Sequence, residues 1–467
     1  MNNRYRYALC FLMVGISLGM ACNPGGEQYV QNEVGKLKIA DNGRYLMMED
    51  GKPFFWLGDT GWKLFLRLDR QEAAQYLEDR HQKGFNVIQV MVSFYNVSAT
   101  NVYGDSIFVN GDVSRPRVTE GNEYGEGDQY DYWDHMDYII DLAAEKGIYM
   151  AIVPVWGTSV RAGWVTVDQA RRYAAFLANR YKNKENIIWL NGGDLAGSDS
   201  TAVWNAIGET LRSNDPNHLI TFHPIGQTQS ATWFHNASWL DFNMFQSGHL
   251  SYDQHAGGYG EDNWRYVSDV YDKEPVKPVL DGEAAYEGIP HGLNDTAQPR
   301  WEAKDMRRNA YWSVFAGACG FTYGNNAVWQ MYKPTDESVE YAPTQYWDEA
   351  MNADGAKQMA HIKKLMLSRP YFERIPDSSM VADQGVMYDY IAATRGNDYA
   401  FLYTFNGRDI AVNMGVIPGE EVKASWYNPR DGVTTNIGVF PNSGTVHFDP
   451  PGEKQVGNDW VLILDKI

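Results

Sequence analysis

Two carboxylates follow short apolar runs of the chain, and glycine precedes each of them. Asp194 ends the segment IIWLNGGD (187–194), and Glu283 ends PVLDGE (278–283). In glycoside hydrolysis one carboxyl group protonates the leaving oxygen, while a second meets the positive charge that develops at the anomeric carbon. That work requires two environments that separate the two pKa values. Asp194 and Glu283 are therefore the candidate pair for such chemistry.

Other polar and aromatic residues stand just past the remaining apolar runs, where a barrel places its substrate contacts. Each has a structural role as its alternative, such as packing or support of a turn. The candidates for substrate contact are Asp59, Trp62, Trp156, Asn191, His223, Gln246, His249, Asp281, Tyr323 and Trp329.

The two acids also have structural alternatives. Asp194 could cap a helix that begins near residues 198–201, since Asp favours helix starts. Glu283 could form an ion pair with Arg307 or Arg308. Asp281 lies two residues before Glu283, so it shares the same strand face and could replace it as the active carboxylate.

Eight short apolar runs alternate with amphipathic segments between about residues 40 and 370. The helical segments at 69–83, 133–143, 170–181 and 306–314 show apolar residues at spacings of three and four, which is typical of core-facing helices. This alternation predicts an α/β fold, a (β/α)8 TIM barrel over residues 37–376. An open doubly wound sheet is the alternative, but no glycine-rich phosphate loop follows an early strand. The predicted strands are 54–57, 86–92, 148–155, 187–190, 219–222, 240–245, 278–280 and 321–323.

Two long insertions, 94–131 and 246–264, follow predicted strands. In a barrel they project from the face that binds substrate, so we expect them to form its walls rather than to be decorative loops.

The pattern changes to a period of two after about residue 377. Apolar alternation at 386–390, 399–404, 410–414, 424–427 and 461–464, separated by turn residues, predicts a small C-terminal β-sandwich over 377–467. This accessory domain could bind glycan or brace the barrel, and inward alternation of its Tyr and Trp residues favours bracing.

The first residues are typical of a secretory signal. Arg4 and Arg6 precede a mostly apolar run, and Ala21-Cys22 follows it. We expect a lipoprotein signal peptide over 1–22, with Cys22 lipidated, and a tether over 23–36. A plain signal peptide and an uncleaved anchor are the alternatives. Cys319 is then the one cysteine in the body of the chain, which leaves no intrachain disulfide to form.

The amino-acid composition restricts the classes of molecule that the protein can bind. The 467 residues carry 40 basic and 59 acidic side chains, a net charge of -19, which disfavours nucleic acid and anionic membrane surfaces. The 16 Trp and 30 Tyr suit a protein that faces carbohydrate, because the C–H faces of sugars stack on aromatic rings. The 10 His residues are scattered without a zinc motif, so we expect neither a metal nor a cofactor.

Three segments together resemble glycoside hydrolase family 140, the apiosidase-type enzymes of gut Bacteroidetes: GDTGW (58–62), WLNGGD (189–194) and LDGE (280–283). Many retaining barrel glycosidases carry Glu directly after the strand-four Asn, whereas this chain has Asp194 three residues after Asn191. The resemblance implies Asp194 as acid/base and Glu283 as nucleophile. It also implies that the substrate is pectic, notably apiose in rhamnogalacturonan II.

The expected function is therefore a glycoside hydrolase that removes apiose or a related side-chain sugar, by a two-carboxylate, retaining mechanism. A non-catalytic lipoprotein that binds glycan or protein on a barrel scaffold is the alternative. The expected partners are an oligosaccharide or polysaccharide and, through the lipid anchor, the outer membrane. The expected location is the cell envelope of a Gram-negative bacterium, on the periplasmic or the outer surface.

Overall fold

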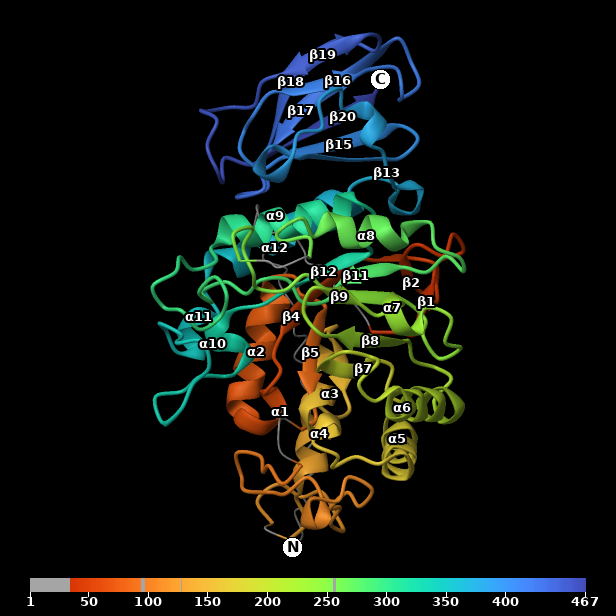
Figure 1. Cartoon of the computed structure of the whole chain (residues 1–467), viewed down its shortest axis with the longest axis vertical. Helices are drawn as coiled ribbons and strands as arrows, with labels where there is room; N and C mark the ends of the chain where they lie inside the picture. Colours follow the sequence, from red (N-terminus) through yellow and green to blue (C-terminus); the bar gives the residue numbers. More distant parts are fainter. Residues whose placement is uncertain (1–33, 94–96, 127, 255–257) are drawn as a thin grey trace, which may run out of the picture. The chain divides into compact units, whose positions relative to one another are not determined.

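The computed structural model describes residues 34–93, 97–126, 128–254 and 258–467. Its central sheet has the order β8-β7-β6-β5-β4-β12-β11-β10-β9 (Figure 1). Neighbouring strands are parallel except for the two-residue β9 (Thr228–Gln229), which pairs antiparallel with β10. The parallel strands are β4 (Trp56–Thr60), β5 (Val87–Met91), β6 (Tyr149–Val153), β7 (Ile187–Leu195), β8 (Ile220–Pro224), β10 (Asn243–Gln246), β11 (Val279–Asp281) and β12 (Gly320–Tyr323).

The sheet closes between β8 and β10 without a continuous ladder. The amide of Asp241 donates to the carbonyl of Ile220 at 2.8 Å, and the hydroxyl of Thr221 donates to the carbonyl of Phe242 at 2.6 Å. Together with the parallel pairing of β4 with β12, these contacts complete a ring of eight parallel strands. The predicted (β/α)8 barrel is confirmed, and the open doubly wound alternative is wrong.

The helices between the strands pack apolar faces against the barrel. α2 begins at a capping box, in which Asp69 and Glu72 each accept the other's backbone amide. The four helices expected from apolar spacing correspond to α2, α3, α5 and α9. The longer helices are α2 (Arg70–Gln82), α3 (Tyr132–Glu145), α5 (Val167–Tyr181), α6 (Thr201–Asn214), α8 (Trp264–Tyr271), α9 (Ala303–Phe315) and α12 (Asp354–Leu367); the short ones are α1 (Leu64–Arg67), α4 (Gly157–Arg161), α7 (Ala231–Phe234), α10 (Asn326–Trp329) and α11 (Trp347–Ala350).

A small antiparallel sheet of β1 (Leu37–Ile39), β2 (Leu46–Met48) and β3 (Pro53–Phe54) precedes the barrel. The first barrel strand starts only after it, at Trp56, and runs to Thr60 rather than ending at residue 57 as expected. Asp59 therefore lies inside the strand, where its backbone pairs with both β5 and β12.

The C-terminal domain is antiparallel, with a six-stranded sheet β13-β14-β15-β20-β17-β18 and a separate pair, β16-β19. One predicted strand is wrong: residues 387–389 form the 3-10 turn η4 (Met387–Asp389), because Met387 adopts a left-handed φ of 50° that a strand cannot contain. The strands are β13 (Ile375–Pro376), β14 (Ile391–Arg395), β15 (Tyr399–Thr404), β16 (Ile410–Asn413), β17 (Glu421–Tyr427), β18 (Thr434–Pro441), β19 (Thr445–Phe448) and β20 (Trp460–Lys466).

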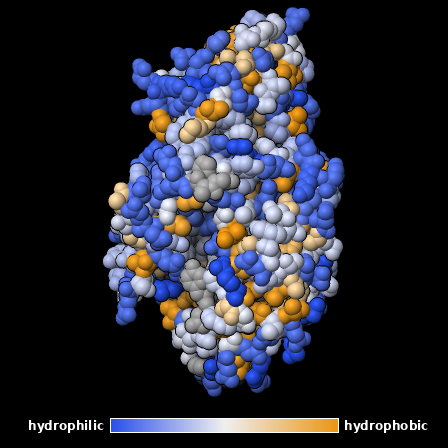
Figure 2. Space-filling view, viewed as in Figure 1, coloured by the Kyte–Doolittle hydropathy of each residue, from blue (hydrophilic) through white to orange (hydrophobic). Residues whose placement is uncertain are grey.

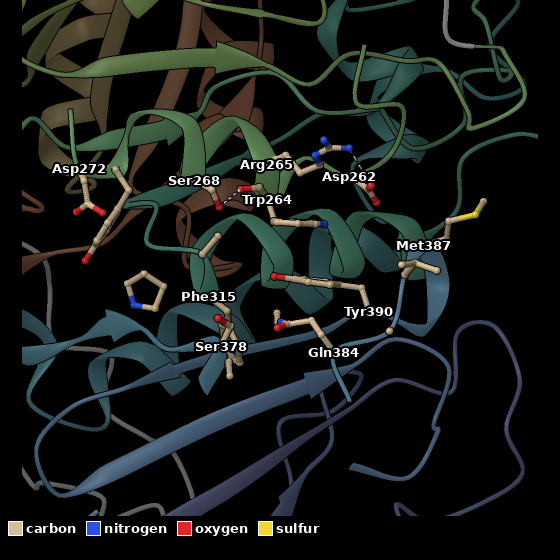
Figure 3. Close-up of a pocket in the computed structure, with 17 residues that line it drawn as sticks. Asp262, Trp264, Arg265, Ser268, Asp272, Phe315, Ser378, Gln384, Met387 and Tyr390 are labelled. Atoms are coloured by element: carbon tan, nitrogen blue, oxygen red, sulfur yellow. Dashed lines mark hydrogen bonds and ion pairs between the residues drawn. The ribbon is translucent and has the colours of Figure 1, made fainter. Parts of the chain in front are cut away.

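Helix α9 contacts this domain at β14 and β15 (Figure 1). Tyr311 stacks on Tyr403 with ring centroids 4.8 Å apart. Arg307 forms a bidentate ion pair with Asp459, at 2.8 and 2.7 Å, and both side chains are buried. A cleft of about 600 Å³ remains between α8, the end of α9 and sandwich residues 376–393 (Figure 3). Neither Asp194 nor Glu283 lines it.

The face of the molecule drawn in Figure 2 is mostly hydrophilic, with hydrophobic residues scattered over it. Among the described residues, no helix combines the length and the apolar character that a membrane crossing would need.

Candidate active site

A pocket of about 330 Å³ brings the two predicted acids together. Asp194 reaches it from the end of β7, and Glu283 from two residues past β11. The other predicted residues that line it are Trp62, Trp156, Gln246, His249 and Trp329. The ends of β4, β6, β7, β10, β11 and β12, and the loops after them, thus deliver polar or aromatic groups to one place, as the carboxyl ends of barrel strands do.

The backbone before Asp194 turns sharply because two glycines precede it. Gly192 has φ 96°, and a Cβ atom there would lie 2.5 Å from the carbonyl oxygen of His223. The ladder between β7 and β8 is irregular between Gly192 and Leu195. Asp194 itself is left-handed, with φ 52°, a conformation that Asp tolerates better than most residues. The strand end therefore holds strain where the carboxyl group turns into the pocket.

Glycine serves a different purpose before Glu283. Gly282 does not have a positive φ; instead, a Cβ atom there would lie 2.6 Å from the sulfur of Met244. The amide of Gly282 donates to the carbonyl of Phe245 at 2.9 Å. Close packing against β10, rather than a left-handed turn, explains the glycine at this position.

Two histidines hold the carboxylate of Glu283, one on each oxygen. Nε2 of His223 lies 2.9 Å from Oε2, and Nε2 of His249 lies 3.3 Å from Oε1. The Nδ1 atoms accept backbone amides, that of Asp194 for His223 at 3.2 Å and that of Tyr286 for His249 at 3.3 Å. Because Nδ1 accepts in both rings, Nε2 carries the proton in both, and each imidazole donates to Glu283.

The two carboxyl groups have pKa values displaced in opposite directions. Burial, reinforced by the nearby charge of Glu283, raises the pKa of Asp194. Burial alone would also raise the pKa of Glu283, but the hydrogen bonds from His223 and His249 outweigh it and lower the pKa to about 2. Glu283 is thus an anion over the whole working pH range, and Asp194 retains its proton to higher pH than an ordinary aspartate.

Aromatic rings form the walls beside the acids. Trp62 meets Trp156 edge to face at 5.2 Å and His223 at 5.1 Å, and its Nε1 donates to the hydroxyl of Tyr286 at 3.0 Å. On another wall, Trp329 lies 6.1 Å from Tyr341, measured between ring centroids. Such walls present flat apolar surfaces to the C–H faces of a sugar and exclude water.

Three predicted substrate contacts lie away from the pocket. Asp59 is fully buried and binds Nε of Arg80 at 2.6 Å, so it supports the barrel interior. The amide of Asn191 donates to the carbonyl of Trp204 at 2.7 Å. The hydroxyl of Tyr323 donates to Glu287 at 2.6 Å. The structure places these three side chains in internal hydrogen bonds, where none of them lines the pocket.

Asp281 is also internal. It accepts hydrogen bonds from the hydroxyl of Ser247, at 3.1 Å, and from the amide of Asn263, at 2.9 Å. Burial raises its pKa to about 7. Asp281 lies two residues before Glu283 in the chain, but its side chain does not line the pocket.

The structural alternatives for the two acids are wrong. Helix α6 takes Ser200 as its N-terminal cap, not Asp194. Arg307 pairs with Asp459, and Arg308 pairs with Glu261 at 2.6 Å, so neither arginine neutralises Glu283.

The two long insertions differ in their contribution. Gln246, Gly248, His249 and Leu250 from the second insertion line the pocket. No residue of the first insertion that the structure describes, 97–126 and 128–131, lines it, so the expected wall is wrong for this part of the chain. Cys22 and the residues around it lie outside the described residues.

About half of the residues that line the pocket were not identified from the sequence. Tyr286 follows Glu283 by three residues, and its position past a strand end could have indicated it. Glu340 and Tyr341 lie in a segment after α10 that has no apolar periodicity. The length of that segment is the sequence feature that could have indicated a role at the pocket. The missed lining residues are Ile225, Gly226, Gln227, Tyr286, Leu293, Glu340 and Tyr341.

Within the described ranges, no group of three or more His, Cys, Asp or Glu side chains has an arrangement that could hold a metal ion. The arrangement supports two-carboxylate acid–base and nucleophilic chemistry through Asp194 and Glu283.

Comparisons with known proteins agree with this chemistry. A family model described as "Apiosidase-like, catalytic domain" matches residues 40–373. A second, described as "Putative collagen-binding domain of a collagenase", matches residues 375–465. A search of curated proteins finds no match.

Solved structures of glycoside hydrolases are similar over nearly the whole chain. One described as "Glycoside hydrolase" is 46% identical, with a TM-score of 0.86, and the match covers 94% of this chain and 99% of that one. A glycoside hydrolase family 5 structure from Bacteroides vulgatus is 43% identical, with a TM-score of 0.89, and the match covers 94% of this chain and 95% of that one. A family 39 glycoside hydrolase from Bacteroides cellulosilyticus, 11% identical with a TM-score of 0.51 and with 92% of this chain and 82% of that one covered, shares the fold.

Proposed function

Because this chain belongs to the apiosidase-like family and is a glycoside hydrolase, we propose that it removes apiose, or a related side-chain sugar, from pectic glycans such as rhamnogalacturonan II. The family description supports the sugar, and the small aromatic pocket of about 330 Å³ is suited to a single terminal sugar residue.

The proposed reaction is retaining and proceeds in two steps. Asp194 gives its proton to the glycosidic oxygen while Glu283 attacks the anomeric carbon, so that the leaving alcohol departs and a glycosyl ester forms on Glu283. Asp194, now ionised, then takes a proton from water, and that water attacks the anomeric carbon. The carbon–oxygen bond to Glu283 breaks, which restores both carboxyl groups and releases the sugar.

The observation that carries this assignment is the opposite displacement of the two pKa values. A nucleophile must be ionised, and the imidazoles of His223 and His249 keep Glu283 ionised by lowering its pKa to about 2. An acid catalyst must keep its proton, and burial beside the charged Glu283 raises the pKa of Asp194. Environments that separate two acids in this way assign their roles.

Substitution of each acid tests the assignment. We expect Glu283→Gln and Asp194→Asn to lower kcat by roughly 10³-fold or more on a natural oligosaccharide. Glu287→Gln is the matched control, because Glu287 is a partly buried acid four residues away that accepts a hydrogen bond from Tyr323 and does not line the pocket. Full turnover in Glu283→Gln would reject Glu283 as the nucleophile.

The stereochemistry and the sugar are tested separately. Proton NMR of the first product should show the anomeric configuration of the substrate; the inverted anomer would reject the retaining mechanism. Aryl apiofuranoside, aryl arabinofuranoside and rhamnogalacturonan II oligosaccharides should be compared by kcat/KM. A preference for an unbranched hexoside would reject the proposed sugar class.

We further propose that the protein is a cell-envelope lipoprotein, anchored in the outer membrane through Cys22, with the tether 23–36 between the anchor and the barrel. The residues around Cys22 lie outside those that the structure describes, so the amino-acid pattern alone supports this proposal. Metabolic labelling with an alkyne fatty acid should mark the wild type and not Cys22→Ser; equal labelling of both would reject it.

A further inference from the structure

The segment after β10 carries His249, one of the two donors to Glu283, and its described residues are 247–254 and 258–263. We propose that Tyr388, in the C-terminal sandwich, is a positioning residue that holds this segment and thereby sets the hydrogen bond from His249 to Glu283. The proposal rests on the assignment of Glu283 as the nucleophile. It gives the sandwich a role in the reaction beyond bracing the barrel.

The two ends of the segment are fixed within the barrel. Ser247, at its start, donates to Asp281 at 3.1 Å, and Asn263, at its end, donates to the same carboxylate at 2.9 Å. Asn263 also donates to the carbonyl of Asn309 in α9, at 2.7 Å. These anchors do not involve the sandwich, so they should survive a change in Tyr388.

The interior of the segment is held by a different carboxylate, that of Glu261. It accepts the amide of Tyr252 at 3.1 Å, which ties the two described parts of the segment together. It also pairs with Arg308 of α9 at 2.6 Å, and both side chains are nearly fully buried. The hydroxyl of Tyr388 donates to its two oxygens at 3.0 and 3.1 Å. One buried anion thus joins the segment, the barrel and the sandwich.

The Tyr388 side chain contacts both the segment and a buried residue of the sandwich. Its ring packs edge to face against Tyr252 at 5.4 Å and against Phe405, which follows β15, also at 5.4 Å. The preceding residue, Met387, is one of the few non-glycine residues with a left-handed φ, and such strain persists where the surroundings enforce it. Figure 3 shows Tyr390 from the sandwich lying along Trp264 of the barrel, and the two rings stack with centroids 4.3 Å apart.

The link to the reaction runs through a short stretch of chain. His249 lies three residues before Tyr252, and its Nε2 is 3.3 Å from Glu283, so a small outward movement would break the contact. Barrel contacts also restrain His249, since its carbonyl accepts the amide of Gly292 at 3.0 Å. The expected effect of losing Tyr388 is therefore partial rather than complete.

The test compares Tyr388→Phe with Tyr403→Phe in the full chain. Tyr403 is the matched control because it is a sandwich tyrosine that faces α9 and donates to Asp459 at 3.2 Å, without contact to the segment. Each variant loses one hydroxyl. Thermal unfolding of both shows whether they lose comparable stability.

The first readout is hydrogen–deuterium exchange of peptides within 247–254, measured without substrate. We expect faster exchange in Tyr388→Phe than in the wild type and in Tyr403→Phe. This readout is independent of catalysis, so it tests the coupling even if the proposed glycosidase assignment of Glu283 fails. Unchanged exchange in Tyr388→Phe would overturn the proposal.

The second readout is the change in kcat and in KM. The titratable groups outside the segment that interact with Glu283 are Asp194, His223, Asp281, Tyr286 and Tyr341, and these should keep their places. Because His249 belongs to the segment, we expect kcat of Tyr388→Phe to fall about fivefold to tenfold with KM changed less than twofold. Unchanged kcat in Tyr388→Phe, or an equal fall in Tyr403→Phe, would overturn the proposal.

Discussion

Replacement of His249 by leucine should move the acidic limb of the pH–rate profile into a measurable range. Glu283 must be ionised to act as a nucleophile, so activity falls as the pH drops through its pKa. In the wild type that pKa is about 2, because His223 and His249 each donate to one of its oxygens. The wild-type acidic limb should therefore lie below the range in which most assays work.

The size of the shift follows from the single bond that is lost. A hydrogen bond to a charged group contributes about 1.5–3 kcal/mol, and one pKa unit corresponds to about 1.4 kcal/mol. Glu283 and His249 are both more than nine-tenths buried, so solvent does not replace the lost donor fully. We expect the acidic limb of His249→Leu to rise by about 1–2 units.

The assay is kcat/KM from pH 2.5 to 8 with an aryl glycoside whose leaving group does not ionise in that range. His249→Gln is the matched control, since its amide can still donate to Glu283 and should move the limb less. Circular dichroism at each pH confirms that the variants remain folded. If His249→Leu loses activity evenly at every pH while its acidic limb stays with the wild type, the explanation of the low pKa of Glu283 is wrong.

Three further outcomes follow from the geometry of the barrel. Asp59→Asn should lower the free energy of unfolding by about 3 kcal/mol, because it removes the fully buried anion of Arg80 and leaves only the partly exposed Asp79 as its partner; a thermal midpoint equal to that of the wild type would contradict this. Gly192→Ala should lower kcat while the protein stays folded, because its φ of 96° and the carbonyl of His223 leave no room for a methyl group; unchanged kcat would show that the turn does not position Asp194. The pKa of Asp281 is raised to about 7, so the folded state holds its proton more tightly than the unfolded chain, and the unfolding free energy should fall as the pH rises from about 4 to 7; urea titrations of Asp281→Asn should show a flatter dependence, and an identical slope would exclude Asp281 as its source.

The positions of the two candidate acids could be predicted because the parallel strands of a barrel all end at one face. The apolar runs before Asp194 and Glu283 identified two strands of that barrel, and the carboxyl ends of those strands meet whatever the intervening loops do. The same reasoning succeeded for Trp156 and Gln246, which also follow strands and line the pocket.

It failed where a strand end was misplaced or where a side chain had a partner far away in the sequence. Asp59 was expected past the first strand, but β4 extends to Thr60 and Arg80 approaches from α2 to bind it. The tautomers of the two histidines depend on backbone amides of Asp194, in β7, and of Tyr286, in the loop after β11. Contacts of that kind are set by tertiary packing and leave no periodic pattern in the sequence.

The seam between β8 and β10 bears on how this scaffold can diversify. There, side-chain and single backbone contacts replace a continuous ladder, so a local change in the spacing of β8 and β10 would break these contacts rather than a row of ladder hydrogen bonds. Ile225 to Gln227, directly after β8, and Gln246, at the end of β10, line the pocket on either side of that seam. Insertions or deletions in residues 230–240 should therefore alter the size of sugar accepted, while the acids on β7 and β11 keep their places, which makes this stretch the natural target for engineering a new specificity.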